Sequence, residues 1–245
     1  RLRGTINQMA EGLEETEKMK NEFISSVSHE LRTPLTSIRG WVETLMTLDD
    51  PTDENYRKGL EIINNETGRL NNMVEELLDF SRLQNGRLKM TCRPLDLVAE
   101  LTDAVLFCEA RIQREGLLLA YAEPEEMIPV YADPDRLRQV FINILDNAIK
   151  YSAAENGFVR AEALVRDGQV VITVTDNGIG IPKEAQSSVF ERFYRVDKSR
   201  SKATGGTGLG LAIVKHIARI HNARIKLESQ VDVGTTITVT FPTAN

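Results

Sequence analysis

Apolar residues recur at alternating steps of four and three through the first 84 residues, the spacing that places one stripe along a helix. It predicts a first helix that reaches about residue 48 and a second that starts near residue 54. The first stripe contains Leu2, Ile6, Met9, Leu13, Thr16, Lys20, Phe23 and Val27, then Ile24, Leu31, Leu35, Ile38, Val42 and Leu45. The second contains Tyr56, Leu60, Ile63, Thr67, Leu70, Val74, Leu77 and Ser81.

Two long amphipathic helices joined by a short loop form an antiparallel hairpin. A lone hairpin cannot bury both stripes, so we expect two copies to pair as a four-helix bundle. The alternative is a hairpin that packs on the C-terminal half of its own chain. Pro34 removes one backbone donor and crowds the preceding turn, so it is expected to interrupt and kink the first helix.

Residues 49–53 have the composition of a loop, in which Thr52 is the predicted N-cap of the second helix. This helix is expected to end near Asn85-Gly86, a common pair after a helix C-terminus.

From about residue 87 the pattern changes to short strands that alternate with helices. The expected strands are 117–121, 158–165, 169–175, 225–230 and 235–241, and the expected helices are 95–114, 134–151 and 208–221. Asp133-Pro134 supplies an N-cap followed by proline at the first helical position. This arrangement predicts an α/β sandwich. The stretch 177–206 has little periodicity, which is typical of a lid or a disordered segment.

Composition excludes several classes of protein. Acids outnumber bases 36 to 30, giving a net charge of −6, which argues against binding nucleic acid through broad phosphate neutralisation. The two cysteines, Cys92 and Cys108, cannot form a disulfide framework and fit a reducing compartment. No apolar run approaches the roughly 20 residues that span a bilayer. The chain begins at Arg1 rather than Met, so we expect it to be part of a longer protein.

His29 lies two residues from Val27 and from Leu31, so it points away from the apolar stripe. Thr33, one turn on, shares its face, and Glu30 is adjacent. A histidine on a polar face is more often a solvated surface residue than a catalytic one. On the helix alone, both interpretations stay open.

The segment Asp176–Ile181 follows directly on an apolar strand and contains Gly178 and Gly180. Two glycines at this spacing allow close approach of backbone to a ligand. An aspartate at a strand end can accept from an exocyclic amine such as that of adenine. Asp-Asn-Gly is also ordinary turn chemistry, so a simple strand exit is the alternative.

Glycines open the helix that begins near residue 208, in the sequence Gly205-Gly-Thr-Gly-Leu-Gly210. Exposed amides at such a helix N-terminus favour phosphate. The segment is not a P-loop, because it lacks Gly-Lys-Ser/Thr, and no strand leads into it as a dinucleotide fingerprint requires.

Asn143 and Asn147 lie one turn apart on the helix 134–151 and therefore face one way. Their amide oxygens can ligate a hard cation that also grips phosphate, and Lys150 adds a further charge. Asparagines that only cap neighbouring backbone would show the same spacing.

Taken in order, these stretches resemble the five sequence boxes of the sensor histidine kinases of two-component systems. Phe23–Leu35 resembles the H box, Arg138–Ser152 the N box, Asp176–Ile181 the G1 box, Val189–Arg195 the F box and Gly205–Leu211 the G2 box. The resemblance implies a signalling coiled coil over 1–20, a dimerisation and histidine phosphotransfer domain over 21–86, and a catalytic domain over 87–245. This last domain would be an ATP-binding α/β sandwich of the kind shared with gyrase and heat-shock chaperone ATPases.

The resemblance also implies two reactions. His29 would attack the γ-phosphate of ATP, with Glu30 orienting or deprotonating the other ring nitrogen, and the phosphoryl group would pass to an aspartate of a response regulator. Asn147, helped by Asn143, would hold Mg²⁺. The implied ATP-binding set is Asn143, Asn147, Lys150, Tyr151, Asp176, Gly178, Gly180, Ile181, Tyr194, Arg195, Gly206, Thr207, Gly208, Leu209, Gly210 and Leu211.

The sequence His29-Glu-Leu-Arg-Thr33 is similar to that of family members that also dephosphorylate their regulator, with Thr33 positioning a water. Alternatively, Thr33 only prepares the turn before Pro34. His216 and His221 match no motif and are expected to be ordinary polar positions.

The expected partners are a second copy and a receiver domain, with no nucleic acid. The parent protein is expected to be attached to a membrane through a preceding region, with these residues on the cytoplasmic side. Two rival functions stay open: an ATP-driven conformational machine in which His29 is incidental, and a scaffold with a degenerate nucleotide site.

Overall fold

The computed structural model describes residues 2–48, 54–84, 90–124, 126–153, 155–192, 194–196 and 208–243. Contacts divide the chain into two compact units. The first comprises Arg1–Ser81 with Ser201–Thr207, and the second comprises Arg82–Arg200 with Gly208–Asn245. No helix in the described ranges is long and apolar enough to cross a membrane. The predicted loop 49–53, with its cap Thr52, and the predicted helix end at Asn85-Gly86 lie outside the described residues.

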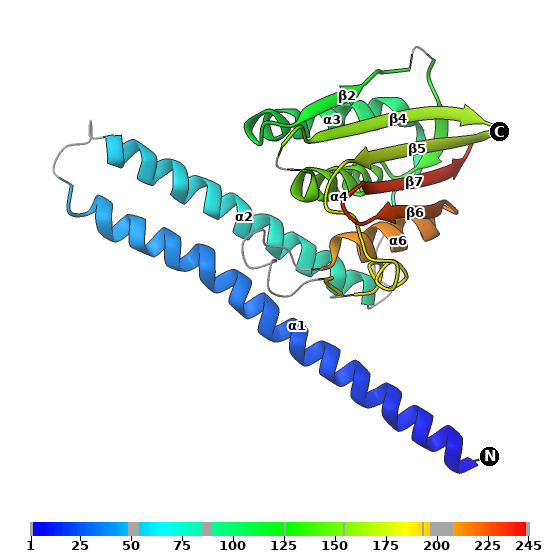
Figure 1. The fold of residues 1–245 in the computed structure, drawn as a ribbon, viewed down its shortest axis with the longest axis horizontal. Helices are drawn as coiled ribbons and strands as arrows, with labels where there is room; N and C mark the ends of the chain where they lie inside the picture. The colour runs from blue at the N-terminus through cyan, green and yellow to red at the C-terminus, as the bar shows by residue number, and fades with distance from the viewer. Residues whose placement is uncertain are drawn as a thin grey trace. The chain divides into compact units, whose positions relative to one another are not determined.

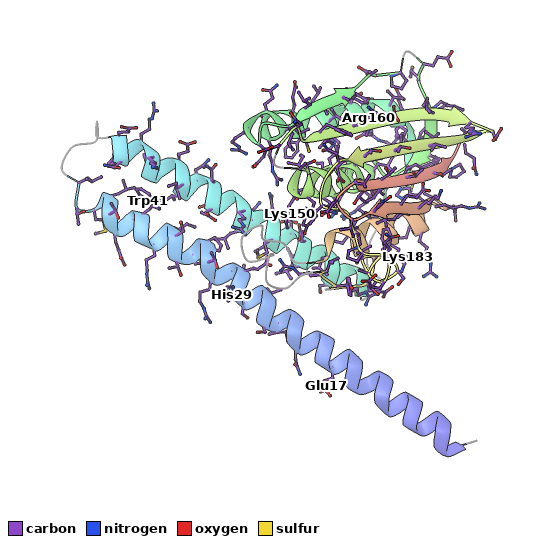
Figure 2. All side chains as sticks on the ribbon, viewed as in Figure 1. Glu17, His29, Trp41, Lys150, Arg160 and Lys183 are labelled. Atoms are coloured by element: carbon purple, nitrogen blue, oxygen red, sulfur yellow. The ribbon has the colours of Figure 1, made fainter. Side chains whose placement is uncertain are left out.

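The first unit is a hairpin of two long helices, α1 (Leu2–Leu45) and α2 (Glu54–Gln84), as Figure 1 shows. Gly59 of α2 lies against α1: a Cβ there would lie 2.9 Å from the Trp41 ring and 3.0 Å from Leu45. Trp41 is labelled near the loop end of the hairpin in Figure 2. The two helices therefore contact each other at this point of the predicted hairpin.

Pro34 does not interrupt α1, contrary to the sequence-based prediction, because the helix continues unbroken through it. The proline deletes only the hydrogen bond that its own nitrogen would donate to the Glu30 carbonyl. The rest of a 44-residue helix keeps its hydrogen bonds. Pro34 itself is buried.

The second unit contains a five-stranded sheet in the order β2-β4-β5-β7-β6. Its strands are β2 (Leu118–Tyr121), β4 (Phe158–Arg166), β5 (Gln169–Asp176), β6 (Arg224–Gln230) and β7 (Gly234–Pro242). The pair β2–β4 is parallel and the other pairs are antiparallel. Helices α3 (Leu97–Arg114), α4 (Pro134–Tyr151) and α6 (Gly210–Ile220) lie together on one face of the sheet (Figure 1).

Alternation along the strands builds the core between the sheet and the helices. Val170, Ile172 and Val174 of β5 are buried, whereas the residues between them are partly exposed. The helices contribute their own buried stripes, among them Leu101, Phe141 and Ile213. The predicted α/β sandwich is confirmed, and α4 has the predicted bounds, with Asp133 as N-cap and Pro134 at the first helical position.

The sequence patterns miss one element, a two-stranded antiparallel sheet of β1 (Arg93–Asp96) and β3 (Pro129–Ala132). Each strand has four residues and contains a proline, which argues against a strand in a sequence pattern. The pairing joins segments far apart in the chain, and Asp96 secures it by accepting from Ile128 N at 2.9 Å. The five predicted strands match the structure within one residue at each end.

Candidate functional site

Helix α4 carries the central part of the candidate site. The Nδ2 of Asn143 donates to the Gly210 carbonyl at 3.4 Å, which brings the middle of α4 to the first residue of α6. At the end of α4, the Tyr151 carbonyl accepts from Ile179 N at 3.1 Å. Helix α4 thus contacts two glycine-containing segments, one that follows Thr175 and one that precedes Leu211. Asn147 lies midway between these two contacts.

The N-terminus of α6 has the character of an anion site. Leu209 is its N-cap residue and offers no side-chain hydrogen bond, and the first turn contains no acidic residue. Gly208 has a φ of +71°, a conformation that glycine adopts without strain. Uncapped first-turn amides attract negative charge. Gly206 and Thr207, two predicted site residues, lie outside the described residues, whereas Gly208, Gly210 and Leu211 are all half-buried.

Asp176 ends β5 and is only 8% exposed. Its Oδ1 accepts from Gly178 N at 2.8 Å, and the backbone of Thr235 also hydrogen-bonds the carboxyl group. Burial raises the pKa of Asp176 above its usual range, and the two backbone hydrogen bonds oppose this rise. A buried acceptor at the end of a strand suits the amino group of a purine.

Gly178 and Gly180 are required by the packing of their own loop. A Cβ on Gly178 would lie 1.7 Å from the Tyr151 carbonyl oxygen, and one on Gly180 would lie 2.0 Å from that of Gln230. Gly180 also has a φ of +65°. The sequence predicted that a ligand approaches the backbone of these glycines closely. In the structure, other backbone segments of the same chain approach them closely. Ile181 fixes the far side of the loop, because its N–H donates to Ser229 Oγ at 2.8 Å.

We expect Gly178→Ala to destabilise the second unit by about 3 kcal/mol or more, since the added methyl group collides with backbone that cannot rotate away. Gly168→Ala is the matched control. Gly168 lies in the β4–β5 turn with open space around it, so its cost of about 1 kcal/mol reflects only its positive φ. Urea unfolding of both variants measures the difference. Equal losses would contradict the packing role of Gly178.

Four further predicted residues carry a positive charge or an aromatic ring. The Nζ of Lys150 lies 5.2 Å from the centroid of the Tyr151 ring, a cation–π contact. Tyr151 and Tyr194 are exposed, and Arg195 is half-buried. Lys150 and Tyr151 belong to α4, whereas Tyr194 and Arg195 follow the turns that lead out of the G1 segment.

The predicted residues of the H box lie on α1 in the first unit. His29 is exposed, as its place opposite the apolar stripe predicts, and it is labelled midway along α1 in Figure 2. Thr33 is also exposed, and its Oγ1 donates to the His29 carbonyl at 3.2 Å. Glu30 is 9% exposed, so it lies on a different face of the helix from His29.

The described residues contain no cluster of three or more His, Cys, Asp and Glu side chains that would cage a metal. The amide oxygens of Asn143 and Asn147 suit a different arrangement. Magnesium commonly takes one or two protein oxygens and completes its shell with water and phosphate oxygens. Asn143 donates through Nδ2 and so leaves its oxygen available. The donor set therefore fits Mg²⁺ that arrives with a nucleotide.

His221 has a role that its sequence surroundings do not indicate. It is buried and hydrogen-bonds the backbone of Asp133, 88 residues earlier, so it is not an ordinary polar position. No sequence pattern near His221 indicates a contact with such a distant residue.

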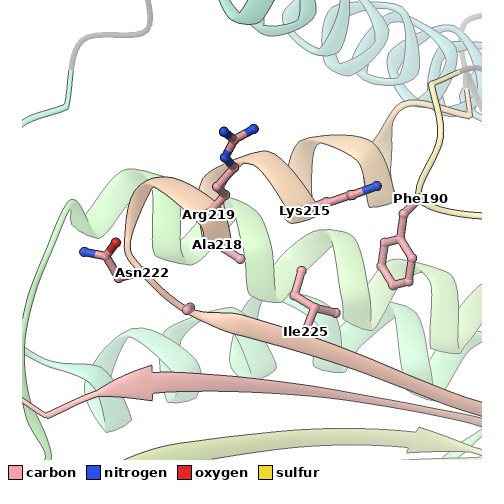
Figure 3. A pocket seen from close by; sticks show the side chains of 7 residues that line it. Phe190, Lys215, Ala218, Arg219, Asn222 and Ile225 are labelled. Atoms are coloured by element: carbon pink, nitrogen blue, oxygen red, sulfur yellow. The ribbon is translucent and has the colours of Figure 1, made fainter.

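A shallow groove also went unpredicted. It lies between α6 and the start of β6 (Figure 3) and is lined by Phe190, Lys215, Ala218, Arg219, Asn222, Ala223 and Ile225. At its rim, Lys215 Nζ lies 3.0 Å from Glu191 Oε1. Phe190 belongs to the stretch that resembles the F box, and none of the lining residues belongs to the implied ATP-binding set.

Comparison with known families divides the chain in the same order as the sequence boxes. Residues 19–86 match the family described as the His Kinase A (phospho-acceptor) domain. Residues 132–245 match the family described as histidine kinase-, DNA gyrase B-, and HSP90-like ATPase.

Similar whole proteins and solved structures come from the same group. The chain is 38% identical over 237 residues to the sensor protein kinase WalK of Staphylococcus haemolyticus, covering 94% of this chain and 38% of WalK. It thus spans well under two thirds of that relative. Histidine kinase ThkA, solved in complex with response regulator protein TrrA, has a TM-score of 0.65 and 26% identity, covering 94% of this chain and 64% of ThkA. Full-length ShkA, solved with AMPPNP, has a TM-score of 0.64 and 28% identity, covering 91% and 46%.

Proposed function

This chain belongs to the sensor histidine kinases of two-component systems, and from that premise we propose that it transfers the γ-phosphoryl group of ATP to His29. The proposed organisation is a signalling coiled coil over 1–20, a dimerisation and phosphotransfer domain over 21–86 and a catalytic domain over 87–245. The phosphoryl group then passes to an aspartate of a response regulator.

The observation that carries the proposal is the pair of contacts made by α4. Asn143 reaches Gly210 at the start of α6, and Tyr151 reaches the loop of Gly178, with Asn147 between them. The proposed adenine acceptor Asp176, the proposed phosphate amides of Gly210 and Leu211 and the proposed metal ligands therefore belong to one packed unit. This arrangement supports a single nucleotide that lies along α4.

The phosphate end of the nucleotide needs positive charge and N–H donors. We assign the donors to the first turn of α6 with Gly206, Thr207, Gly208 and Leu209, and the charges to Lys150 and Arg195. Tyr151 and Tyr194 add hydroxyl groups, and Ile181 with Gly180 shapes the purine pocket. Asn147 and Asn143 would hold Mg²⁺, which when bound neutralises charge on the phosphate oxygens.

His29 acts as the nucleophile through the unprotonated nitrogen of its neutral imidazole. That nitrogen forms a bond to the γ-phosphorus as the bond from this phosphorus to the bridging oxygen of ADP breaks. Exposure of His29 leaves the ring accessible to an incoming phosphoryl group. Glu30 is next in sequence but is buried on another face of α1, and we propose that it orients the imidazole or accepts the proton from its other nitrogen when the His29 side chain turns toward it.

A second copy of the chain is the proposed partner of the hairpin. Large apolar side chains remain 40–54% exposed on both helices of a single hairpin: Ile24, Leu35, Val42, Leu60, Val74 and Leu78. Burial of this apolar surface against another hairpin is favourable in free energy. Pairing of two hairpins as a four-helix bundle supplies that cover.

The proposed kinase reaction is tested by incubating the chain with ATP labelled at the γ-phosphate and Mg²⁺. Phosphohistidine is lost in acid and survives in alkali, so we expect label on the protein with that stability. An isolated receiver domain then receives the label on an aspartate. Label that survives acid, or no label despite bound nucleotide, would contradict the proposed function.

Thr33 supports a second candidate activity, removal of the phosphoryl group from the regulator. Its hydroxyl is exposed one turn from His29 and can accept from a water while it donates to the His29 carbonyl. We expect Thr33→Val to lower receiver dephosphorylation about 100-fold, because the hydroxyl that holds the water is gone. Autophosphorylation should stay within about twofold of wild type. Thr36→Val, which removes another exposed hydroxyl on α1, is the control; equal loss in both variants would refute the assignment.

A further inference from the structure

His221 connects two helices that carry different parts of the proposed ATP site. It follows α6 as the C-cap residue and is 8% exposed. Its Nε2 accepts from Asp133 N at 3.0 Å, and its Nδ1 lies 2.9 Å from the Ile217 carbonyl oxygen. Both ring nitrogens are therefore engaged, one with α6 itself and the other with the N-cap of α4.

These two contacts define one form of the ring. An Nε2 that accepts a hydrogen bond carries no proton, so the proton of the neutral imidazole is on Nδ1 and is donated to Ile217. The backbone of Asp133 is in turn held in place by its own side chain. The Asp133 carboxylate accepts from Arg136 N at 3.2 Å and from Thr91 N at 2.7 Å. His221 thus fastens α6 to a rigid N-cap.

The second fastening lies at the other end of α6. There Gly210 accepts from Asn143, ten residues after Asp133 along α4. Gly210 and His221 are eleven residues apart, so the two contacts join similar lengths of antiparallel helix. A helix held at only one end can rotate or slide against its neighbour. Held at both ends, α6 keeps its first turn in a defined register against Asn143 and Asn147.

We propose that His221 is a positioning residue for nucleotide binding, acting through its hydrogen bond from Asp133 N. This inference rests on the proposed function, because the first turn of α6 and the face of Asn143 and Asn147 are the proposed phosphate and metal-binding groups. Without this bond, α6 loses one of the two contacts that orient its uncapped amides relative to α4. His221 itself touches no part of the proposed nucleotide.

Two variants separate positioning from general stability. In His221→Gln, the side-chain oxygen can occupy the place of Nε2 and accept from Asp133 N. In His221→Asn, the shorter amide can donate to Ile217 but does not reach Asp133. Both variants lose one buried hydrogen bond, so their losses of stability should be similar. His216→Asn makes the same chemical change on the same helix, at a half-buried histidine without this contact.

The affinity of the full chain for ATP and Mg²⁺ is measured by calorimetry. We expect the dissociation constant to rise about tenfold in His221→Asn, the effect of one lost hydrogen bond. In His221→Gln and His216→Asn it should rise less than threefold. Hydrogen exchange of the nucleotide-free protein provides a second readout, with faster exchange in His221→Asn only at Ile213 N–H, which donates to the Leu209 carbonyl at the start of α6.

The outcomes distinguish this inference from the proposed function. Equal affinity in the Gln and Asn variants, or unchanged exchange at Ile213 N–H, would refute the positioning role while leaving ATP binding intact. Failure of the wild-type chain to bind ATP would refute the proposed function, and the exchange measurement would still test the helix fastening by itself.

Discussion

His29→Gln is expected to abolish phosphorylation of the chain, leaving about a hundredth or less of the acid-labile label that wild type acquires from ATP. The glutamine side chain is similar in reach and polarity but has no nucleophilic nitrogen. Because His29 is exposed and lies outside the second unit, neither the fold nor the nucleotide site loses a contact. The label on the protein is counted after acid treatment and, in a second sample, after alkaline treatment. Bound nucleotide is measured separately.

The control for this result is His216→Gln, which removes another histidine from the chain without touching the proposed acceptor. It should be labelled as wild type is. ATP affinity and thermal unfolding of His29→Gln should match those of wild type, since substitutions at exposed sites rarely shift stability by more than about 0.5 kcal/mol. Acid-labile label on His29→Gln would show that a different residue is the acceptor. Wild type that binds nucleotide without acquiring acid-labile label would instead favour the rival interpretation, in which His29 is incidental to an ATP-driven machine.

Regular elements with a full period could be predicted from the sequence. The steps of four and three in α1 and α2 continue over many turns, and the alternation of β5 has eight residues in which to show itself. The N-cap of α4 is a local signal, since Asp133 and Pro134 adjoin the helix they start. By contrast, β1 and β3 are short, and each forms a strand only by pairing with the other.

Contacts between distant segments could not be predicted, because nothing local distinguishes the residues that make them. Gly178 follows an aspartate and an asparagine, as many turn glycines do, yet its missing Cβ leaves room for the carbonyl of Tyr151, 27 residues earlier. His221 has no motif around it, and its partner Asp133 belongs to another helix. By contrast, the exposure of His29 was predictable, because it follows from the apolar stripe on its own helix.

Asp176 offers the second large effect, because it is the proposed acceptor for the adenine amino group. In Asp176→Asn one oxygen becomes an NH₂ group, and it must face either the backbone N–H of Gly178 or Thr235, or the amine of the base. A donor facing a donor in a buried site forfeits a hydrogen bond and leaves polar groups unsatisfied. We expect ATP affinity to fall about 100-fold. Asp167→Asn, at an exposed turn with a φ of +53° that Asn tolerates, should leave it unchanged.

Inosine triphosphate, which carries a carbonyl in place of the amine, separates a lost acceptor from a damaged pocket. Wild type should prefer ATP over it strongly, and Asp176→Asn should lose most of that preference. An unchanged preference would mean that another group reads the base.

The pH dependence of binding tests the same carboxyl group. Burial raises the pKa of Asp176 above the ordinary range of an aspartate. The ionised carboxylate is an acceptor only, whereas the protonated group carries an O–H that would face the amine of the base. ATP affinity of wild type should therefore decline on acidification, starting at a pH above the ordinary range of Asp. In the nucleotide-free chain the sign is opposite. A raised folded-state pKa means that the native state holds the proton more tightly, so this group's contribution to stability is present below the unfolded pKa and is lost as pH rises through the folded one. Asp176→Asn should remove both dependences, and titrations of affinity and of urea unfolding measure them. If both survive in the variant, they originate from a different group and Asp176 does not accept the base.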